Sequence, residues 1–181
     1  MIVGSGCICM DPAKLSAIVT WPPPKTVKAV HALLGFCNFY QKFIPNFSNI
    51  VAPLTNLTQK SVAWTWGTDQ QSVFSTLLSL FQIAPVLYLP DVSRPFIVMT
   101  DTSLLASGGV LMQQDSNGDL HPCTYLSQTF SPAERNYDIY DRELLAIIHA
   151  LEHWRHYLQG TTHPVTLLMD HKNLTYFRQP Q

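Results

Sequence analysis

The spacing of apolar residues changes along the chain. In the first 60 residues apolar positions recur every three or four residues, as at Val27, Val30 and Leu34, and no strand pattern interrupts the stretch from Asp11 to this point. This period is typical of amphipathic helices. Thr26 can cap one such helix, and prolines end or interrupt the helices around it. We predict helices over residues 14–21, 27–44 and 46–58, the last of them broken at Pro53.

Beyond these helices and one further helix the period shortens to two. Residues 64–66 form a candidate short strand or turn, and Thr68 makes a capping box with Gln71 at the start of a helix that Pro85 ends. Residues 115–119 read as a hairpin turn. Strands are predicted over residues 96–100, 108–113, 121–127 and 165–169.

A long helix separates the third and fourth of these strands. Ser131 and Glu134 make a capping box before it, Asp138 caps it, and Gly160 ends it. The helix is predicted to run to Leu158 and to be roughly 30 Å long. A further helix is predicted over residues 171–177. The order strand, strand, strand, helix, strand, helix indicates an α+β fold with a mixed sheet of the α/β type. The predicted buried stripe of the long helix is Leu144, Ile147, Ile148, Leu151, Trp154 and Leu158.

Three acidic residues lie where apolar segments begin or end. Asp101 follows the apolar run of residues 95–100, Asp170 follows that of residues 165–169, and Glu143 begins the stripe of the long helix. Carboxylates are rarely buried unless they are paired or bind a metal. Because clustered carboxylates repel one another, a divalent cation is the simplest way to keep all three ionised. Taken singly, each acid has an ordinary alternative, as a helix-start residue or a strand-exit turn residue.

Composition indicates a globular chain. The 181 residues are 46% hydrophobic and 13% charged, and the net charge of −1 does not indicate nucleic-acid binding by itself. No run of residues is long and apolar enough to span a membrane, and no secretory signal is evident. The four cysteines have no zinc-binding spacing, and we interpret them as reduced and intracellular.

Several short motifs follow one another in a fixed order. They are residues 10–14, Trp21-Pro22, residues 34–44, 85–103, 126–137, 143–147, 155–158 and 170–174. Together they resemble the reverse transcriptases of gypsy-class LTR retrotransposons. The resemblance implies a helical thumb-like or connection-like segment over residues 1–62, at the junction of polymerase palm and thumb. It implies a ribonuclease H-like domain over residues 63–181, without the last strand and last helix of that fold.

The sequence departs from the family pattern beside the first acid. The family usually has alanine where Thr102 stands and glycine where Ala106 stands, and Leu104 and Leu105 replace more polar residues. These residues could crowd the hairpin beside the metals. We interpret the chain as an internal piece of a larger polyprotein, with palm and fingers upstream and integrase downstream, or as a decayed copy. An intracellular location is implied, in a cytoplasmic retrotransposon particle or in the nucleus.

The resemblance also implies a chemistry for the acids. In the enzymes that the chain resembles, two Mg²⁺ ions lie roughly 3.5–4 Å apart, with Mn²⁺ as the alternative ion. Asp101 would bridge the ions, Glu143 would hold one, and Asp170 would help to hold the other. The reaction would be endonucleolytic cleavage of the RNA strand of an RNA–DNA hybrid by phosphodiester hydrolysis. The isolated chain would be weakly active or inactive.

Nucleic-acid contacts are also candidates outside the acids. Lys25, Lys28 and Lys42 can face phosphates as a thumb would, and a solvated helix face is the alternative. Ser103 is a candidate nucleic-acid contact, with a local hydrogen-bonding role as the alternative. Among the aromatic residues, Phe39 is interpreted as core rather than base-stacking. Two functional classes remain: a hybrid-cleaving nuclease module, and a catalytically inactive remnant that only binds nucleic acid or has a structural role.

Overall fold

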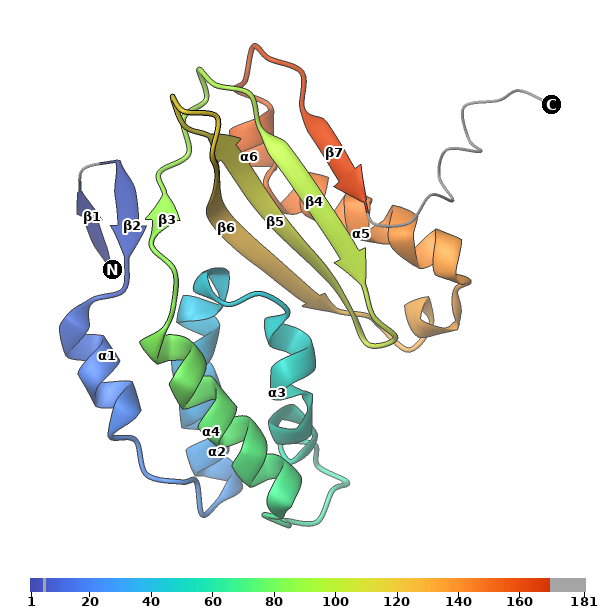
Figure 1. Ribbon diagram of the computed structural model, residues 1–181. Helices are drawn as coiled ribbons and strands as arrows, with labels where there is room; N and C mark the ends of the chain where they lie inside the picture. Colours follow the sequence, from blue (N-terminus) through green and yellow to red (C-terminus); the bar gives the residue numbers. More distant parts are fainter. Residues whose placement is uncertain (5, 170–181) are drawn as a thin grey trace.

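The computed structural model describes residues 1–4 and 6–169. Its first part is a helical module in which the predicted helices form (Figure 1). Thr26 caps its helix as predicted, because its hydroxyl accepts a hydrogen bond from the Ala29 amide at 3.2 Å. The helices of this module are α1 (Pro12–Val19), α2 (Val27–Tyr40), the short 3-10 helix η1 (Gln41–Phe43), α3 (Phe47–Asn56) and α4 (Thr68–Gln82).

A small antiparallel sheet beside this module was not predicted. It has the order β1-β2-β3, with β1 (Ile2–Gly4), β2 (Cys7–Cys9) and β3 (Leu87–Tyr88). Each strand has three residues or fewer, which is too short for a period of two to be recognised. Residues 64–66, a candidate strand or turn, form no strand.

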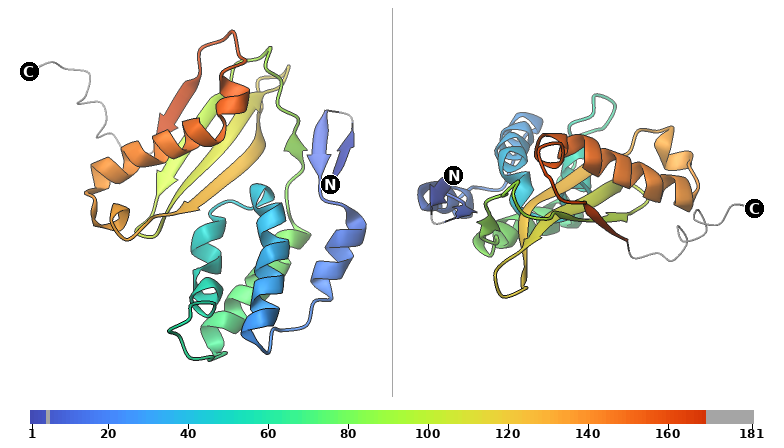
Figure 2. Two further views of the ribbon diagram at one scale, coloured as in Figure 1. Left: turned by 180° about the vertical axis from the view of Figure 1, so that it is seen from behind. Right: turned by 90° about the horizontal axis from the view of Figure 1, so that it is seen from above.

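The second part is a four-stranded mixed sheet with the order β6-β5-β4-β7. Its strands are β4 (Ile97–Thr102), β5 (Ala106–Gln114), β6 (Leu120–Thr129) and β7 (Thr166–Met169), at the four predicted places. Strand β4 pairs with β5 in antiparallel and with β7 in parallel orientation. Helices α5 (Ile139–His153) and α6 (Arg155–Leu158) lie along one face of this sheet, as the two views of Figure 2 show. The α+β fold with a mixed sheet is confirmed.

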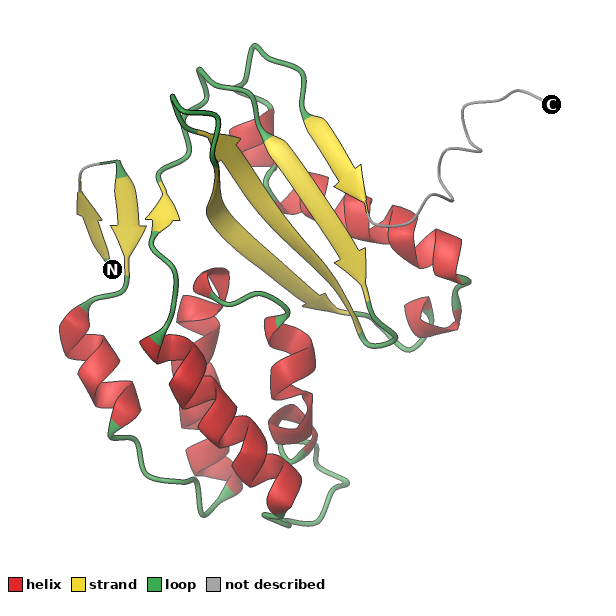
Figure 3. Cartoon of the chain, viewed as in Figure 1, coloured by secondary structure: helices red, strands yellow, loops and turns green. Residues whose placement is uncertain are grey.

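Figure 3 shows the helical module and the four-stranded sheet beside each other, and each has a hydrophobic core of its own. The first core includes Phe74, Leu77 and Phe81 from α4, as well as Leu87. The second begins at Phe96 and lies between the sheet and α5. A division between residues 62 and 63 stays a prediction for the domain organisation, but by packing α4 belongs with the helices that precede it. Within the described residues no helix is long and apolar enough to cross a bilayer.

The buried face of α5 differs from the predicted stripe. Glu143, Ala146, Ile147 and Ala150 are buried, and Trp154 packs below them at the end of the helix. Leu144 and Ile148 are each 42% exposed, and Leu151 is 36% exposed. The prediction was right for Ile147 and Trp154 but wrong for Leu144, Ile148 and Leu151, so the buried face is turned by about one residue, or roughly 100°, from the predicted stripe. The cause is that the apolar pattern excluded a buried polar pair, Arg142 and Glu143, from the inner face.

Two of the predicted caps also differ in detail. The Ser131 amide donates to Glu134 Oε2 at 2.6 Å and the Glu134 amide donates to Ser131 Oγ at 3.3 Å, so this capping box is confirmed. It begins only a 3-10 turn, η2 (Glu134–Asn136). The Thr68 box was wrong, because Gly67 is the N-cap residue of α4 and Gln71 instead accepts a hydrogen bond from the Trp66 indole.

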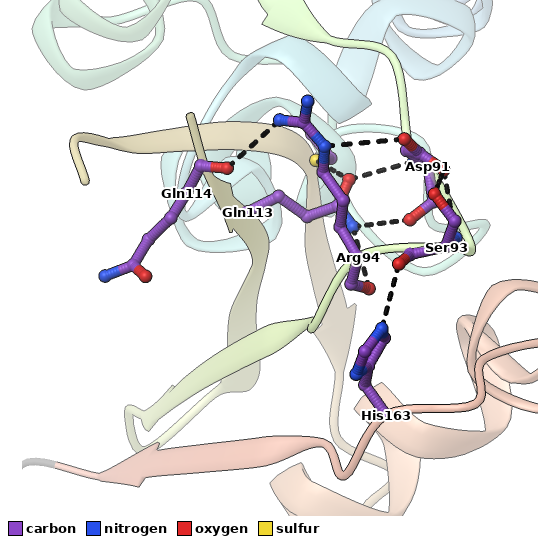
Figure 4. Close-up of polar contacts among 7 residues, drawn as sticks. Asp91, Ser93, Arg94, Gln113, Gln114 and His163 are labelled. Atoms are coloured by element: carbon purple, nitrogen blue, oxygen red, sulfur yellow. Dashed lines mark hydrogen bonds and ion pairs between the residues drawn. The ribbon is translucent and has the colours of Figure 1, made fainter. Parts of the chain in front are cut away.

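A buried glutamine fixes the segment that leads into β4 (Figure 4). Gln113 on β5 is fully buried, and its Oε1 accepts a hydrogen bond from the Asp91 amide at 2.9 Å. Its Nε2 donates to the Asp91 carbonyl at 2.7 Å and to the Arg94 carbonyl at 3.3 Å. His163, in the loop before β7, contacts the Ser93 carbonyl through Nε2 at 2.9 Å. The starts of β4 and β7 are therefore tied to each other through the segment of residues 91–94.

Candidate active site

Asp101 lies near the end of the central strand β4, where its side chain is exposed. Its Oδ1 accepts a hydrogen bond from the Thr102 amide at 2.7 Å. Its register partner on β5 is Gly108, which has no side chain and leaves the carboxylate open on that side. Because side chains alternate along a strand, Asp101 shares its face with Met99, while Val98 and Thr100 are buried on the face that α5 covers.

Glu143 lies in the first turns of α5 on the side that faces the sheet, where it is only 6% exposed. The preceding residue, Arg142, is 8% exposed, and its Nη1 donates to the Ser103 carbonyl at 3.3 Å. This bond ties the start of α5 to the turn that follows β4. Burying a carboxylate and a guanidinium side by side is costly unless both are compensated. Contacts must therefore compensate both charges at this place, and the bond of Arg142 to the Ser103 carbonyl is one of them.

The described residues do not bring the three predicted acids together. Asp101 lies on the sheet face away from α5. Glu143 lies on α5 itself, on the side that faces the sheet. Met169 of β7 pairs with Thr100, and Asp170, which follows it in the sequence, lies outside the described residues. Over residues 1–4 and 6–169 there is no group of three His, Cys, Asp or Glu side chains that could hold a metal ion. Convergence of the acids stays a prediction, and it requires Glu143 to reach past the end of β4.

The hydroxyl of Ser103 is occupied by contacts within the protein. It lies 2.9 Å from Asn49 Oδ1 and 3.0 Å from the Ala106 carbonyl, and it accepts hydrogen bonds from the Leu105 and Ala106 amides. These contacts close the turn between β4 and β5 and fasten it to α3. They support the local role left open by the sequence, while a nucleic-acid contact of Ser103 stays a prediction.

The three candidate lysines do not form one patch. Lys25 and Lys28 are exposed at the start of α2, and Lys42 follows its other end in η1, roughly 20 Å away along the helix. The Lys42 ammonium lies 5.8 Å from the centre of the Phe43 ring, and partial burial lowers its pKa. Contacts of all three with nucleic acid stay predictions.

A pocket between α3 and the sheet was not predicted from the sequence. Asn46, Asn49, Asp101 and Tyr125 are among the residues that line it. The Ser48 amide donates to Ser127 Oγ at 2.8 Å, so α3 is held against β6 at this place. Asn46 has a positive φ of 55°, a conformation that asparagine tolerates better than most residues. The Pro-Asn pair could have indicated a turn there, but nothing in the sequence indicated its contact with the sheet.

The fold and site define a class of protein. Residues 66–167 match the family described as "RNase H-like domain found in reverse transcriptase". Because this match covers more than half of the chain, the chain belongs to that family. The resemblance to retrotransposon reverse transcriptases is thereby confirmed.

Curated relatives narrow the family further. The Transposon Tf2-3 and Tf2-4 polyproteins of Schizosaccharomyces pombe (strain 972 / ATCC 24843) are each 38% identical to this chain over 160 residues. These alignments cover 88% of this chain but only 12% of each relative, so the chain spans a small part of the length of the polyproteins that it matches.

Solved structures share the fold. A foamy viral protease-reverse transcriptase in complex with dsDNA aligns with 99% of this chain and 39% of its own, with a TM-score of 0.77 and 20% identity. A second foamy viral protease-reverse transcriptase, in complex with RNA/DNA hybrid, aligns with 93% of this chain and 23% of its own, with a TM-score of 0.74 and 21% identity. At this level of identity the likeness shows the fold.

Proposed function

We propose that this chain is the ribonuclease H part of a retrotransposon reverse transcriptase polyprotein and cleaves the RNA strand of RNA–DNA hybrids. The observation that carries the proposal is the buried Glu143 in the first turns of α5, a helix whose start is hydrogen-bonded through Arg142 to the Ser103 carbonyl in the turn after β4. Membership in the family and the order of the strands support it. The palm and fingers and the integrase would be supplied by other parts of the polyprotein, inside the cell.

The donor chemistry suits a hard divalent cation. We propose that Asp101, Glu143 and Asp170 hold two Mg²⁺ ions through carboxylate oxygens, with Mn²⁺ able to replace them. Burial raises the pKa of Cys37 and of Cys123 to about 12, so these thiols stay protonated near neutral pH and are unsuited to binding a soft metal. Two bound ions would supply positive charge at the scissile phosphate and an activated water.

The roles of the protein residues follow from their places. Asp101 stands on the open face of the sheet, where a nucleic-acid backbone can reach it. Glu143 is held by a rigid helix, and the Arg142 bond to the Ser103 carbonyl fixes the start of that helix against the β4–β5 turn. A carboxylate held in this way keeps its orientation when the substrate binds.

Cleavage of a hybrid whose RNA strand carries a fluorescent label tests the proposal, in a chain extended by the downstream part of the polyprotein, because the 181 residues alone are expected to be weakly active or inactive. Glu143→Gln keeps the size of the side chain and removes its charge, and Asp101→Asn does the same on β4. A metal ligand contributes several kcal/mol, so each change should lower the cleavage rate by at least about 100-fold. Glu152→Gln is the matched control, because Glu152 is an exposed acid on the same helix. Cleavage by Glu143→Gln at the rate of the unchanged chain would refute the assignment.

A binding role without catalysis is the second candidate. The observation that favours it is that Asp101 lies on the sheet face away from the helix that carries Glu143. In that case the chain would bind hybrids but leave them intact in both Mg²⁺ and Mn²⁺. Asp101→Asn would then change the affinity for the hybrid, and neither the variant nor the unchanged chain would cleave it. Measuring affinity and cleavage on the same labelled hybrid distinguishes the two candidates.

A further inference from the structure

A groove runs along the outer edge of β6, separate from the candidate acids. Its walls come from the end of α2 with η1 and from the end of α5, and β6 residues 125–128 form its floor. Strand β6 is an edge strand of its sheet, and Figure 1 shows the end of α2 close to it. The β6-edge groove therefore lies between the helical module and the four-stranded sheet with its helix α5. The side chains that line it include Asn38, Phe39, Gln41, Lys42, Gln128 and His153.

The lining of this groove suits an anion. Within the described residues no Asp or Glu lines it, whereas Lys42 and His153 face it from opposite walls together with three side-chain amides. Burial lowers the pKa of both Lys42 and His153, and His156 lowers that of His153 further. An anion in the groove would reverse this effect, because an opposite charge stabilises the protonated forms. The amides add hydrogen-bond donors without adding net charge.

Phe39 gives the groove an aromatic surface. Its side chain is 60% exposed, so its interpretation as a core residue was wrong. The Phe39 ring packs edge-on against the ring of the buried Tyr40, with 4.8 Å between the ring centroids and an interplanar angle of 82°. A single exposed apolar residue is ordinary. Beside a lysine and amides in one groove, however, an exposed ring is what proteins use to stack on an unpaired base.

We propose that the β6-edge groove binds a single-stranded nucleic-acid segment, with Phe39 stacking on a base and Lys42 contacting the backbone phosphates. A duplex is a poorer occupant, because its paired bases cannot reach a side chain at the groove edge. Tyr125 lines both this groove and the pocket that contains Asp101, so the two sites are neighbours on β6. The inference rests on the proposed function for its nucleic-acid context, but not on cleavage.

Fluorescence anisotropy with labelled single-stranded DNA and RNA tests the groove. Measurements in EDTA exclude cleavage and use the complete 181-residue chain. Phe39→Ala should weaken binding by roughly 5- to 150-fold, the effect of losing one base–aromatic stack. Lys42→Ala should weaken binding and reduce the slope of log affinity against log salt by about 0.7. Ile83→Ala and Lys60→Ala are the matched controls, because both residues are exposed and outside the groove, and both should bind as the unchanged chain does.

A conservative variant separates stacking from a loss of structure. Phe39→Trp should retain binding, and the indole fluorescence should be quenched when the oligonucleotide is added. The inference is overturned if Phe39→Ala binds as tightly as the unchanged chain, if the two controls weaken binding equally, or if polyglutamate displaces the oligonucleotide as effectively as unlabelled single strand does.

The outcome is independent of the nuclease assignment. Glu143→Gln should abolish cleavage of hybrids and leave single-strand affinity unchanged. If Glu143→Gln cleaves normally while Phe39→Ala loses binding, the proposed function fails and the groove stands. If Glu143→Gln is inactive and Phe39→Ala binds normally, the groove fails and the nuclease assignment stands.

Discussion

Replacing Gln113 with methionine should destabilise the chain, although the two side chains have similar length and volume. The amide of Gln113 satisfies the Asp91 amide and carbonyl at 2.9 and 2.7 Å and also reaches the Arg94 carbonyl at 3.3 Å. A thioether can replace none of these bonds. Gln113 is fully buried, so the groups that it leaves behind lose their main partner in a site that water reaches poorly.

The expected loss follows from those contacts. The two bonds to Asp91 are short, and an unsatisfied buried polar group costs about 1–3 kcal/mol, so the free energy of unfolding should fall by about 2–4 kcal/mol. The longer bond to Arg94 adds little. For a chain of this size the melting temperature should then fall by roughly 5–15 °C. Methionine keeps the volume, so no cavity contributes to this change.

Urea unfolding followed by circular dichroism measures the change, with calorimetry for the melting temperature. Gln114→Met is the matched control, because the Gln114 side chain is exposed and points away from this network in Figure 4. The control should unfold within about 0.5 kcal/mol of the unchanged chain. If Gln113→Met does the same, the segment of residues 91–94 is held by other contacts and the reasoning is refuted.

Three further changes have defined signs. Gly109→Ala should destabilise by about 1–3 kcal/mol in urea unfolding, because a Cβ there would lie 3.2 Å from the Trp154 ring on the crowded inner face. Gly35→Ala, in the interior of α2 with no atom within 4 Å of the new Cβ, should instead stabilise by about 0.5–1 kcal/mol. The hydrogen bond from His121 lowers the pKa of Asp115 below its usual 3.8. The ionised Asp115 side chain therefore stabilises the fold above pH 3.8, and this stabilisation is lost as pH falls through the lowered pKa. The loss of stability from Asp115→Asn should therefore shrink as pH falls from 7 into the acid range, and a loss that stays the same at every pH would contradict this account.

The regular elements of the larger sheet were predicted well from the sequence, because the strands there are either short apolar runs or segments that alternate with a period of two. The positions of β4, β5, β6 and β7 followed from that pattern. The contacts between elements far apart in sequence could not be predicted from that pattern. Nothing local to Ser103 indicates Asn49 as its partner, and nothing near Gln113 indicates Asp91. Such pairs arise only after the chain has folded, so a pattern of single residues cannot contain them.

Helix α4 shows a second limit of the same kind. Its own pattern predicted a helix correctly, but not which core would receive its apolar face. Phe74 and Phe81 pack against the preceding helices rather than against the larger sheet. An amphipathic helix has one apolar face whichever partner covers it. Which of the two cores the helix joins therefore depends on the loops that fix its position, and not on its own sequence pattern. Family matching and packing therefore divide the chain at different residues.

The error in the buried face of α5 is informative about function. A stripe chosen to maximise apolar residues leaves Arg142 and Glu143 outside, yet both are buried while Leu144 and Ile148 are exposed. Hydrophobic burial alone would turn the helix the other way, since burying a large aliphatic side chain stabilises by about 1.5–3 kcal/mol whereas burying a charge is costly. A helix that reverses this preference is fixed by other contacts, here the small Ala146 and Ala150 against the sheet and Trp154 at its end. Sites where the apolar pattern and the structure disagree are where functional residues are expected. On α5 that disagreement is centred on the acid that we propose as a metal ligand.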